Sequence, residues 1–188
     1  MQISSKKFEI LDAAQEIIQT RGYNGFSYAD ISKAVGIRKA SIHHHFASKS
    51  SLGVAVVRRY RETFNNCLAE FESGGKKWID KIRSYAMLYE DVLLKNRLCL
   101  CGMLAADIET LPRLLQKEIR TFFDDNEAWL AKVLSTRYKS MSNSRLNEIA
   151  WQIISTLQGG VIMARMQNKT KIFSSTVREL LVQLEKLK

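Results

Sequence analysis

The scarcity of proline is the feature that most constrains what this chain can fold into, because an internal proline breaks a helix. Pro112 is the single proline among 188 residues. Apolar side chains recur at steps of three and four, the period of one helix face, and strand-like alternation is scarce. In residues 6–20 these side chains are Phe8, Ile10, Leu11, Ala14, Ile17 and Ile18. We therefore predict an all-α protein of about nine helices.

Helix caps and breaks predict where these helices lie. Ser27 followed by Asp30 matches a capping box at a helix start, and Gly36 suits the end of that helix. The Ser73–Gly75 step is the clearest break in the chain. The predicted helices span residues 6–20, 27–36, 38–45, 49–72, 76–95, a short segment after a turn at 96–102, 111–138, 142–166 and 174–187. We expect a three-helix domain at residues 1–48 and a larger helical domain at residues 49–188.

The charge of the chain indicates a polyanionic partner. The formal net charge is +10 and the isoelectric point is about 9.6, and nucleic acid is the commonest polyanion that basic proteins bind. No apolar run of about 18 residues predicts a membrane span, and no secretory leader is recognised. Three cysteines, a low and odd number, do not form a disulfide framework. We expect a cytoplasmic protein without a membrane partner.

Residues 27–49 have the pattern of a helix-turn-helix, in which two short helices cross over a tight turn that Gly36 permits. The spacing of five apolar residues predicts that they pack between these helices and the first one; they are Ile31, Ala34, Ile37, Ile42 and Phe46. The opposite face then carries Arg38, Lys39, Ser41, His43 and His44. Arginine and lysine on such a face can pair with guanine in the major groove. The alternative is a structural helical hairpin with a solvated basic face.

The run from His43 to Leu52 ends this motif and enters the next helix. Together with Phe8, Ala13–Ala14, Gly22–Tyr23 and Phe26–Ser27, it resembles the TetR family of bacterial transcriptional repressors over about the first fifty residues. The resemblance implies an N-terminal DNA-binding head and a C-terminal helical ligand-binding and dimerisation domain.

The resemblance also implies the DNA contacts. It places Ser27 and Tyr28 on phosphates, Arg38, Lys39 and Ser41 on bases or adjacent phosphates, and His43, His44 and Lys49 on the DNA backbone. Two positions depart from the family pattern, since His43 is usually tyrosine and Arg38 is often a small hydroxyl residue that caps the helix. Arg38 is therefore our candidate for a base-reading residue peculiar to this chain.

Metal and enzyme chemistry find little support in the sequence. The neighbouring histidines His43 to His45 point about 100° apart on a helix and cannot close a zinc site by themselves. No nucleophile elbow, phosphate-binding glycine loop or hydrolase spacing of histidine and carboxylate occurs. We expect no metal, no cofactor and no enzymatic activity.

Cys99 and Cys101 leave two interpretations open. Free cysteines often behave as small apolar core residues, whereas a thiolate in a suitable environment reacts with electrophiles. Residues 98–109 resemble a stretch of one TetR subgroup with members that respond to electrophiles or small acids. Aromatic residues of the C-terminal helices are either core or the wall of a ligand cavity. Our candidate effector-sensing residues are Cys99, Cys101, Tyr85 and Trp129.

The last two predicted helices carry enough apolar surface for a homodimer interface: Trp151, Ile154, Leu157, Val161, Val177, Leu180, Leu181 and Leu184. Gly159–Gly160 either permits close helix approach or only loosens the helix. We therefore expect a homodimeric regulator, a repressor that a small-molecule effector or cysteine modification releases from a palindromic double-stranded operator. The alternative is an architectural nucleic-acid-binding protein without a ligand switch.

Overall fold

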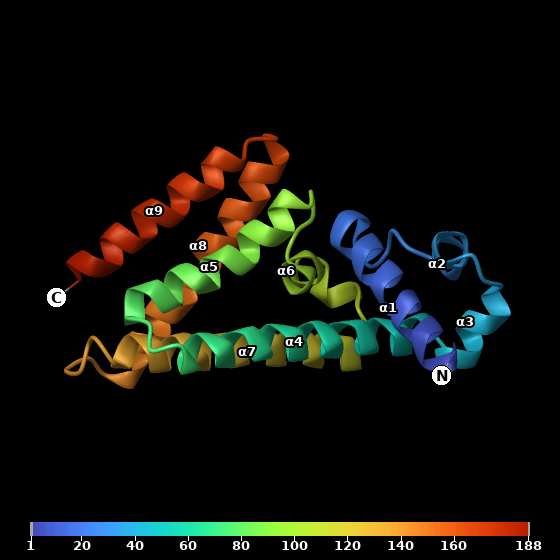
Figure 1. The fold of residues 1–188 in the computed structure, drawn as a ribbon, viewed down its shortest axis with the longest axis horizontal. Coiled ribbons are helices and arrows are strands. Elements are labelled where there is room, and N and C mark those ends of the chain that lie inside the picture. The colour runs from blue at the N-terminus through green and yellow to red at the C-terminus, as the bar shows by residue number, and fades with distance from the viewer. Residues whose placement is uncertain (1, 188) are drawn as a thin grey trace. The chain divides into compact units, whose positions relative to one another are not determined.

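The computed structural model describes the backbone of residues 2–187 and the side chains of residues 6–187, and in this range the chain is all-α (Figure 1). The helices are α1 (Gln2–Arg21), α2 (Tyr28–Val35), α3 (Lys39–His45), α4 (Lys49–Ser73), α5 (Trp78–Leu94), α6 (Leu100–Ala105), the 3₁₀ helix η1 (Ile108–Thr110), α7 (Arg113–Ser135), α8 (Asn143–Met166) and α9 (Thr170–Lys186). The predicted all-α class is confirmed. No helix within residues 2–187 has the length and apolar character needed to cross a bilayer.

Most helix ends follow the predicted signals. Ser27 caps α2, and Gly36 ends it with φ +69°, a left-handed conformation that favours glycine. Three helices begin earlier than predicted: α1 at Gln2 rather than near Lys6, α6 at Leu100 inside the predicted turn, and α9 at Thr170 rather than near Ser174. Asn168 also adopts the left-handed region, with φ +50°, and reverses the chain directly after α8. The next helix therefore starts earlier than its apolar pattern predicts.

One compact unit comprises the residues up to Glu62 together with Leu100–Thr121. Helix α1 packs against α2 and α6, and α2 packs against α3. The core of this unit contains Ile10, Ile18, Ile31, Ile42 and Leu52, all without exposed surface. Gly53 allows α4 to approach the Tyr23 ring, since a Cβ atom there would lie 2.9 Å from it. The short helices of the motif are thus fixed on a small apolar core.

The second unit comprises Thr63–Cys99 and the residues from Phe122 onward. Helix α9 packs on α5 and α8, and α5 also packs on α8. The core of this unit is rich in aromatic residues: Tyr85, Tyr89, Phe122 and Phe173 are each at most 1% exposed. The units are defined by packing, and α4 and α7 contribute residues to both. The predicted domain boundary between residues 48 and 49 separates the three helices of the DNA-binding head from the rest of the chain, and it stays a prediction.

The two neighbouring glycines of α8 differ in surroundings. A Cβ atom on Gly160 would lie 3.2 Å from a Phe173 ring carbon and 3.3 Å from the Thr176 methyl group. Gly159 has no such neighbour within 4 Å. Of the two interpretations of this pair, close helix approach therefore applies to Gly160, which brings α8 against α9.

Candidate functional sites

Helices α2 and α3 form the predicted helix-turn-helix on an apolar inner side. Ile31 and Ile42 are fully buried, and Phe46, at the C-terminal cap of α3, is 5% exposed. Two of the predicted packing residues differ: Ala34 is exposed and Ile37 is half-buried. The large buried side chains of Ile31, Ile42 and Phe46 fill the contact between α2 and α3, so the small Ala34 side chain is not needed there.

The opposite side of the motif is polar and exposed. Arg38, Lys39, Ser41, His43 and His44 all lie at the surface, and we call these five residues the recognition face. Arg38 stands at the N-cap of α3 with extended backbone, and its side chain makes no capping hydrogen bond. The guanidinium is therefore not used to close its own helix.

Ser27 and Tyr28 already have partners within the motif. The Ser27 backbone N–H and hydroxyl donate to Asp30 Oδ2 at 2.8 and 2.6 Å. These hydrogen bonds hold the pKa of the Asp30 carboxyl below its usual value. The Tyr28 hydroxyl donates to the Phe46 carbonyl at 2.8 Å, and its ring lies 4.6 Å from that of His43. Both residues shape the motif, and their phosphate contacts remain predictions.

Lys49 lies against aromatic rings at the start of α4. Its Nζ atom is 4.7 Å from the Tyr23 ring centroid and 4.5 Å from that of Phe26. Burial lowers the pKa of Lys49. A phosphate contact would require the ammonium group to leave or share this site. Lys7, which our site prediction omitted, is exposed near the start of α1, and its Nζ atom lies 6.0 Å from the Phe46 ring centroid. The adjacent pair Lys6–Lys7 was the available signal in the sequence.

An ion-pair cluster in the first unit was not predicted. Glu118 on α7 is 7% exposed and receives Arg58 Nη2 at 2.7 Å and Arg61 Nη1 at 3.2 Å. The two arginines are one turn apart on α4, so a single carboxylate holds one face of that helix. The contact joins residues far apart in sequence, which no local pattern reveals.

Three of the four candidate sensing residues lie together in the second unit. The Tyr85 and Trp129 rings stack with centroids 5.7 Å apart. Burial raises the pKa of Tyr85, the hydrogen bond between the Tyr85 and Tyr89 hydroxyls opposes this increase, and the neighbouring Cys99 thiol adds to it. Cys99 is 1% exposed. Cys101 is also buried, but it belongs to the first unit.

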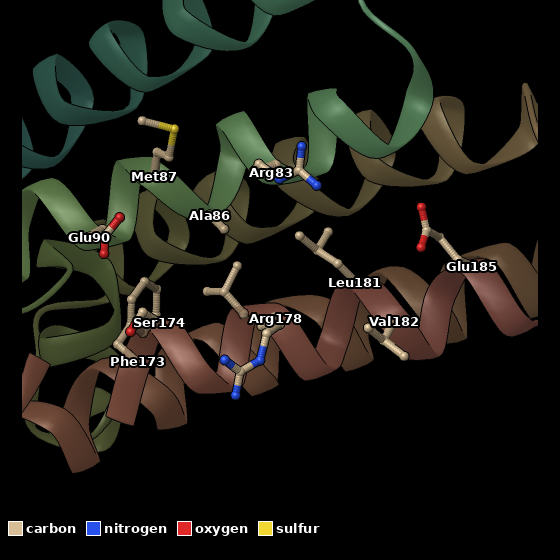
Figure 2. Close-up of a pocket in the computed structure, with 11 residues that line it drawn as sticks. Arg83, Ala86, Met87, Glu90, Phe173, Ser174, Arg178, Leu181, Val182 and Glu185 are labelled. Carbon is tan, nitrogen blue, oxygen red and sulfur yellow. The ribbon is translucent and has the colours of Figure 1, made fainter. Parts of the chain in front are cut away.

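A groove of about 390 Å³ lies between α5 and α9 (Figure 2). Apolar side chains such as Ala86, Phe173 and Leu181 line it, and charged side chains of both helices lie around them. None of the four candidate sensing residues lines this groove; Tyr85, Trp129 and Cys99 belong to the core of the same unit. Within the described chain, no group of three or more histidine, cysteine or acidic residues is arranged to hold a metal ion.

The apolar residues predicted for a dimer interface are mostly core. Six of them are at most 8% exposed: Ile154, Leu157, Val161, Leu180, Leu181 and Leu184. Trp151 is exposed, and so are three apolar residues that the prediction did not include, namely Ile162, Met163 and Met166. These buried residues belong to α8 and α9, which pack on each other and on α5 within the same chain. Val177 is half-buried. The exposed apolar residues of α8 are therefore the candidates for contact with a second copy.

The known proteins that this chain resembles are bacterial transcriptional regulators. Residues 10–56 match the family model described as bacterial regulatory proteins, tetR family. The biofilm operon icaADBC negative transcriptional regulator IcaR of Staphylococcus aureus is 28% identical over 139 residues, which cover 67% of this chain and 74% of IcaR.

Two solved structures are similar over nearly the whole chain. A TetR transcriptional regulator from Legionella pneumophila is 32% identical, with a TM-score of 0.84 and coverage of 92% of this chain and 93% of that one. A TetR-family regulator from Agrobacterium tumefaciens is also 32% identical, with a TM-score of 0.87 and coverage of 96% and 98%. The similarity therefore extends beyond the helix-turn-helix to the C-terminal helices.

Proposed function

Because this chain belongs to the TetR family of bacterial transcriptional regulators, we propose that it is a homodimeric repressor that an effector releases from a palindromic operator. The observation that carries the proposal is the recognition face. Five polar or basic side chains are exposed on α3 and its N-cap, while Ile42 of the same helix is fully buried. A helix anchored on one side and polar on the other suits insertion into the major groove.

The recognition face divides the contacts by chemistry. Arg38 and Lys39 read guanine O6 and N7, and Ser41 contacts a base or an adjacent phosphate. His43, His44 and Lys49 bind the DNA backbone together with Ser27 and Tyr28 at the start of α2. In this arrangement the Ser27 hydroxyl keeps donating to Asp30, so it has no proton left to donate to a phosphate oxygen. Ser27 therefore contacts the phosphate through a bridging water, and we assign it the weakest contact.

The dimer forms through α8 and α9. Trp151, Ile162, Met163 and Met166 lie exposed on α8, and Gly159 leaves open space between them. An exposed apolar strip on a helix is typical of an interaction surface. Two copies joined there would present two recognition faces to successive major grooves about 34–36 Å apart, which favours a palindromic site.

Effector sensing belongs to the second unit. A small molecule acts there through Tyr85 and Trp129, or an electrophile acts there through Cys99; Cys101, which belongs to the first unit, is the second candidate thiol. A thiol that is 1% exposed reacts only after the surrounding helices open, so modification of Cys99 would favour a different packing of the unit. Either route releases DNA only if the two conformations bind the effector unequally.

Selection from random DNA duplexes tests the DNA-binding part. The protein should recover a palindrome, and Arg38→Ala should relax the preference at one base in each half-site by about 5- to 150-fold. Arg145→Ala, at an exposed arginine of α8, is the matched control and should leave the motif unchanged. Binding without a recovered motif would instead indicate an architectural nucleic-acid-binding protein.

Thiol alkylation tests the cysteine route. N-ethylmaleimide should release the operator from the unsubstituted protein and not from Cys99→Ser, with Cys101→Ser as the matched comparison. Release that persists in the double variant would exclude Cys99 and Cys101 and would point to alkylation of Cys67, the third free cysteine. The absence of release from the unsubstituted protein would exclude the cysteine route and leave a non-covalent effector.

A further inference from the structure

A group of side chains in the second unit combines aromatic rings with buried polar atoms that lack partners. It comprises Phe64 on α4, Tyr85 and Tyr89 on α5, and Phe122, Asn126 and Trp129 on α7; we call it the polar-aromatic cluster. The Phe64 ring contacts Tyr85, Tyr89 and Phe122, with centroids 5.8, 6.2 and 5.1 Å away. Trp129 joins through its stacking on Tyr85.

Two atoms of the cluster have no hydrogen-bond partner among the residues that the structure describes. Asn126 has no exposed surface and Trp129 is 8% exposed, yet Asn126 Oδ1 and Trp129 Nε1 are both unpaired. The Asn126 side-chain amide donates to the Phe122 carbonyl, which fixes its orientation. The two residues are three apart on α7 and so lie on one helix face. One is a donor and the other an acceptor, and leaving such groups buried and unpaired is costly.

The surroundings of these atoms disfavour charge. All six side chains of the cluster are uncharged. Burial raises the pKa of Tyr85, which means that this environment resists a phenolate, and the same desolvation opposes a bound carboxylate. Aromatic rings attract cations, but a buried cation also needs a counter-charge, which the cluster does not contain.

We propose that the polar-aromatic cluster is the recognition site for the effector, and that the effector is a small, planar, uncharged molecule carrying a hydrogen-bond acceptor beside a donor, as in a primary aromatic amide. Its carbonyl accepts from Trp129 Nε1 and its N–H donates to Asn126 Oδ1. The ring of the ligand packs among the aromatic side chains. The inference rests on the proposed function only in giving this ligand the role of effector. Because the cluster is enclosed, binding selects conformations in which the second unit opens, and this is how the ligand would shift the ensemble.

Three isosteric probes separate charge from shape. Benzamide offers both an acceptor and a donor, benzoate offers acceptors and a negative charge, and benzamidine offers donors and a positive charge. Titration calorimetry and thermal shift on the purified full chain should show benzamide binding at least about tenfold more tightly than either charged analogue. Equal or tighter binding of benzoate or benzamidine would overturn the proposal. So would the absence of benzamide binding, since water would then satisfy the two atoms.

Variants locate the site. Trp129→Phe keeps an aromatic ring and removes the N–H donor, so benzamide affinity should fall by about tenfold. Trp78→Phe is the matched control, because Trp78 packs on Tyr138 outside the cluster. Met87→Gln changes the lining of the groove between α5 and α9 and should also leave affinity unchanged. Unchanged binding by Trp129→Phe, or loss with Met87→Gln alone, would place the ligand elsewhere.

The ligand site and the DNA-binding function are tested by separate measurements. Benzamide binding is measured without DNA, and operator selection is measured without ligand. A protein that selects a palindrome and does not bind benzamide keeps the proposed function and loses this inference. A protein that binds benzamide at Trp129 but holds its operator unchanged has the site, and the role as effector is overturned.

Discussion

A single residue, Asp30, makes the stability of the α2 N-terminus dependent on pH. Hydrogen bonds from the Ser27 hydroxyl and backbone N–H lower the pKa of Asp30. A carboxyl whose folded pKa is lowered stabilises the fold above its ordinary pKa of about 4, and this contribution is lost as the pH falls through the folded value. Asp30→Asn should therefore destabilise the protein at pH 7 and much less at pH 3. Urea unfolding at both pH values measures the difference.

The control for this prediction is Asp124→Asn, which changes an exposed carboxylate of α7 outside any cap. It should leave the pH dependence of unfolding nearly as it was. A constant gap between Asp30→Asn and the unsubstituted protein from pH 7 to pH 3 would mean that the capping box contributes no pH dependence.

Between elements, Glu118 holds α4 to α7 inside the first unit. Its nearly buried carboxylate binds Arg58 and Arg61, which are partly exposed. Glu118→Gln keeps the shape of the side chain and removes the negative charge that Arg58 and Arg61 share. We expect the free energy of unfolding to fall by about 2 kcal/mol, less than for a fully buried pair because solvent screens the arginines. Denaturant unfolding measures this, with Glu109→Gln, at an exposed position of η1, as the control; equal effects would mean that the cluster adds no stability.

The contact of α8 with α9 depends on Gly160. Gly160→Ala places a methyl group 3.2 Å from the Phe173 ring and 3.3 Å from the Thr176 methyl group, so these side chains must move by a few tenths of an ångström. We expect overpacking of this kind to cost about 1–3 kcal/mol. Gly159→Ala meets no neighbour within 4 Å and should stabilise the helix by up to about 1 kcal/mol, since alanine favours helix more than glycine does. We thus expect alanine to lower the free energy of unfolding at position 160 and to raise it at position 159. Chemical denaturation tests this, and a stabilising Gly160→Ala would show that α9 adjusts freely.

Local signals account for the elements, and tertiary contacts account for what was missed. The Ser27–Asp30 box and Gly36 predicted the limits of α2, because caps act within a few residues. The exposed recognition face followed from helical spacing. The position of the Lys49 ammonium against the Tyr23 and Phe26 rings did not follow, since these contacts depend on how the chain turns before α2.

The sensing residues illustrate the same limit. Tyr85 and Trp129 were singled out by residue type, and Cys99 by a resemblance, but their contact joins separate helices and has no sequence period. Residue type likewise did not separate Cys99 from Cys101, which lie in different units. The spacing of apolar residues on α8 predicted an apolar helix face. It did not distinguish the core of the protomer from a dimer interface, because both are built from the same residue types.

For the whole molecule, the proposed homodimer predicts that operator affinity comes from two DNA-binding heads that each bind weakly. A single α3 offers few base contacts, and a net charge of +10 adds attraction that is independent of sequence and weakened by salt. In a dimer, the second head binds at the high effective concentration set by the first. Loss of the dimer should therefore reduce operator affinity by about a hundredfold or more, with little change in binding to random DNA.

Ile162→Glu tests this coupling, because Ile162 is 42% exposed and a charge there spoils an apolar interface without disturbing the core of the protomer. Light scattering should report the mass of one 21.5 kDa chain instead of two, while circular dichroism keeps the helical signal. Leu94→Glu makes the same kind of change at a 67% exposed residue of α5 and should stay dimeric. If Ile162→Glu remains a dimer with full operator affinity, the interface lies on another face; if it becomes a monomer and still binds the palindrome tightly, one head is sufficient and the need for two-fold symmetry is lost.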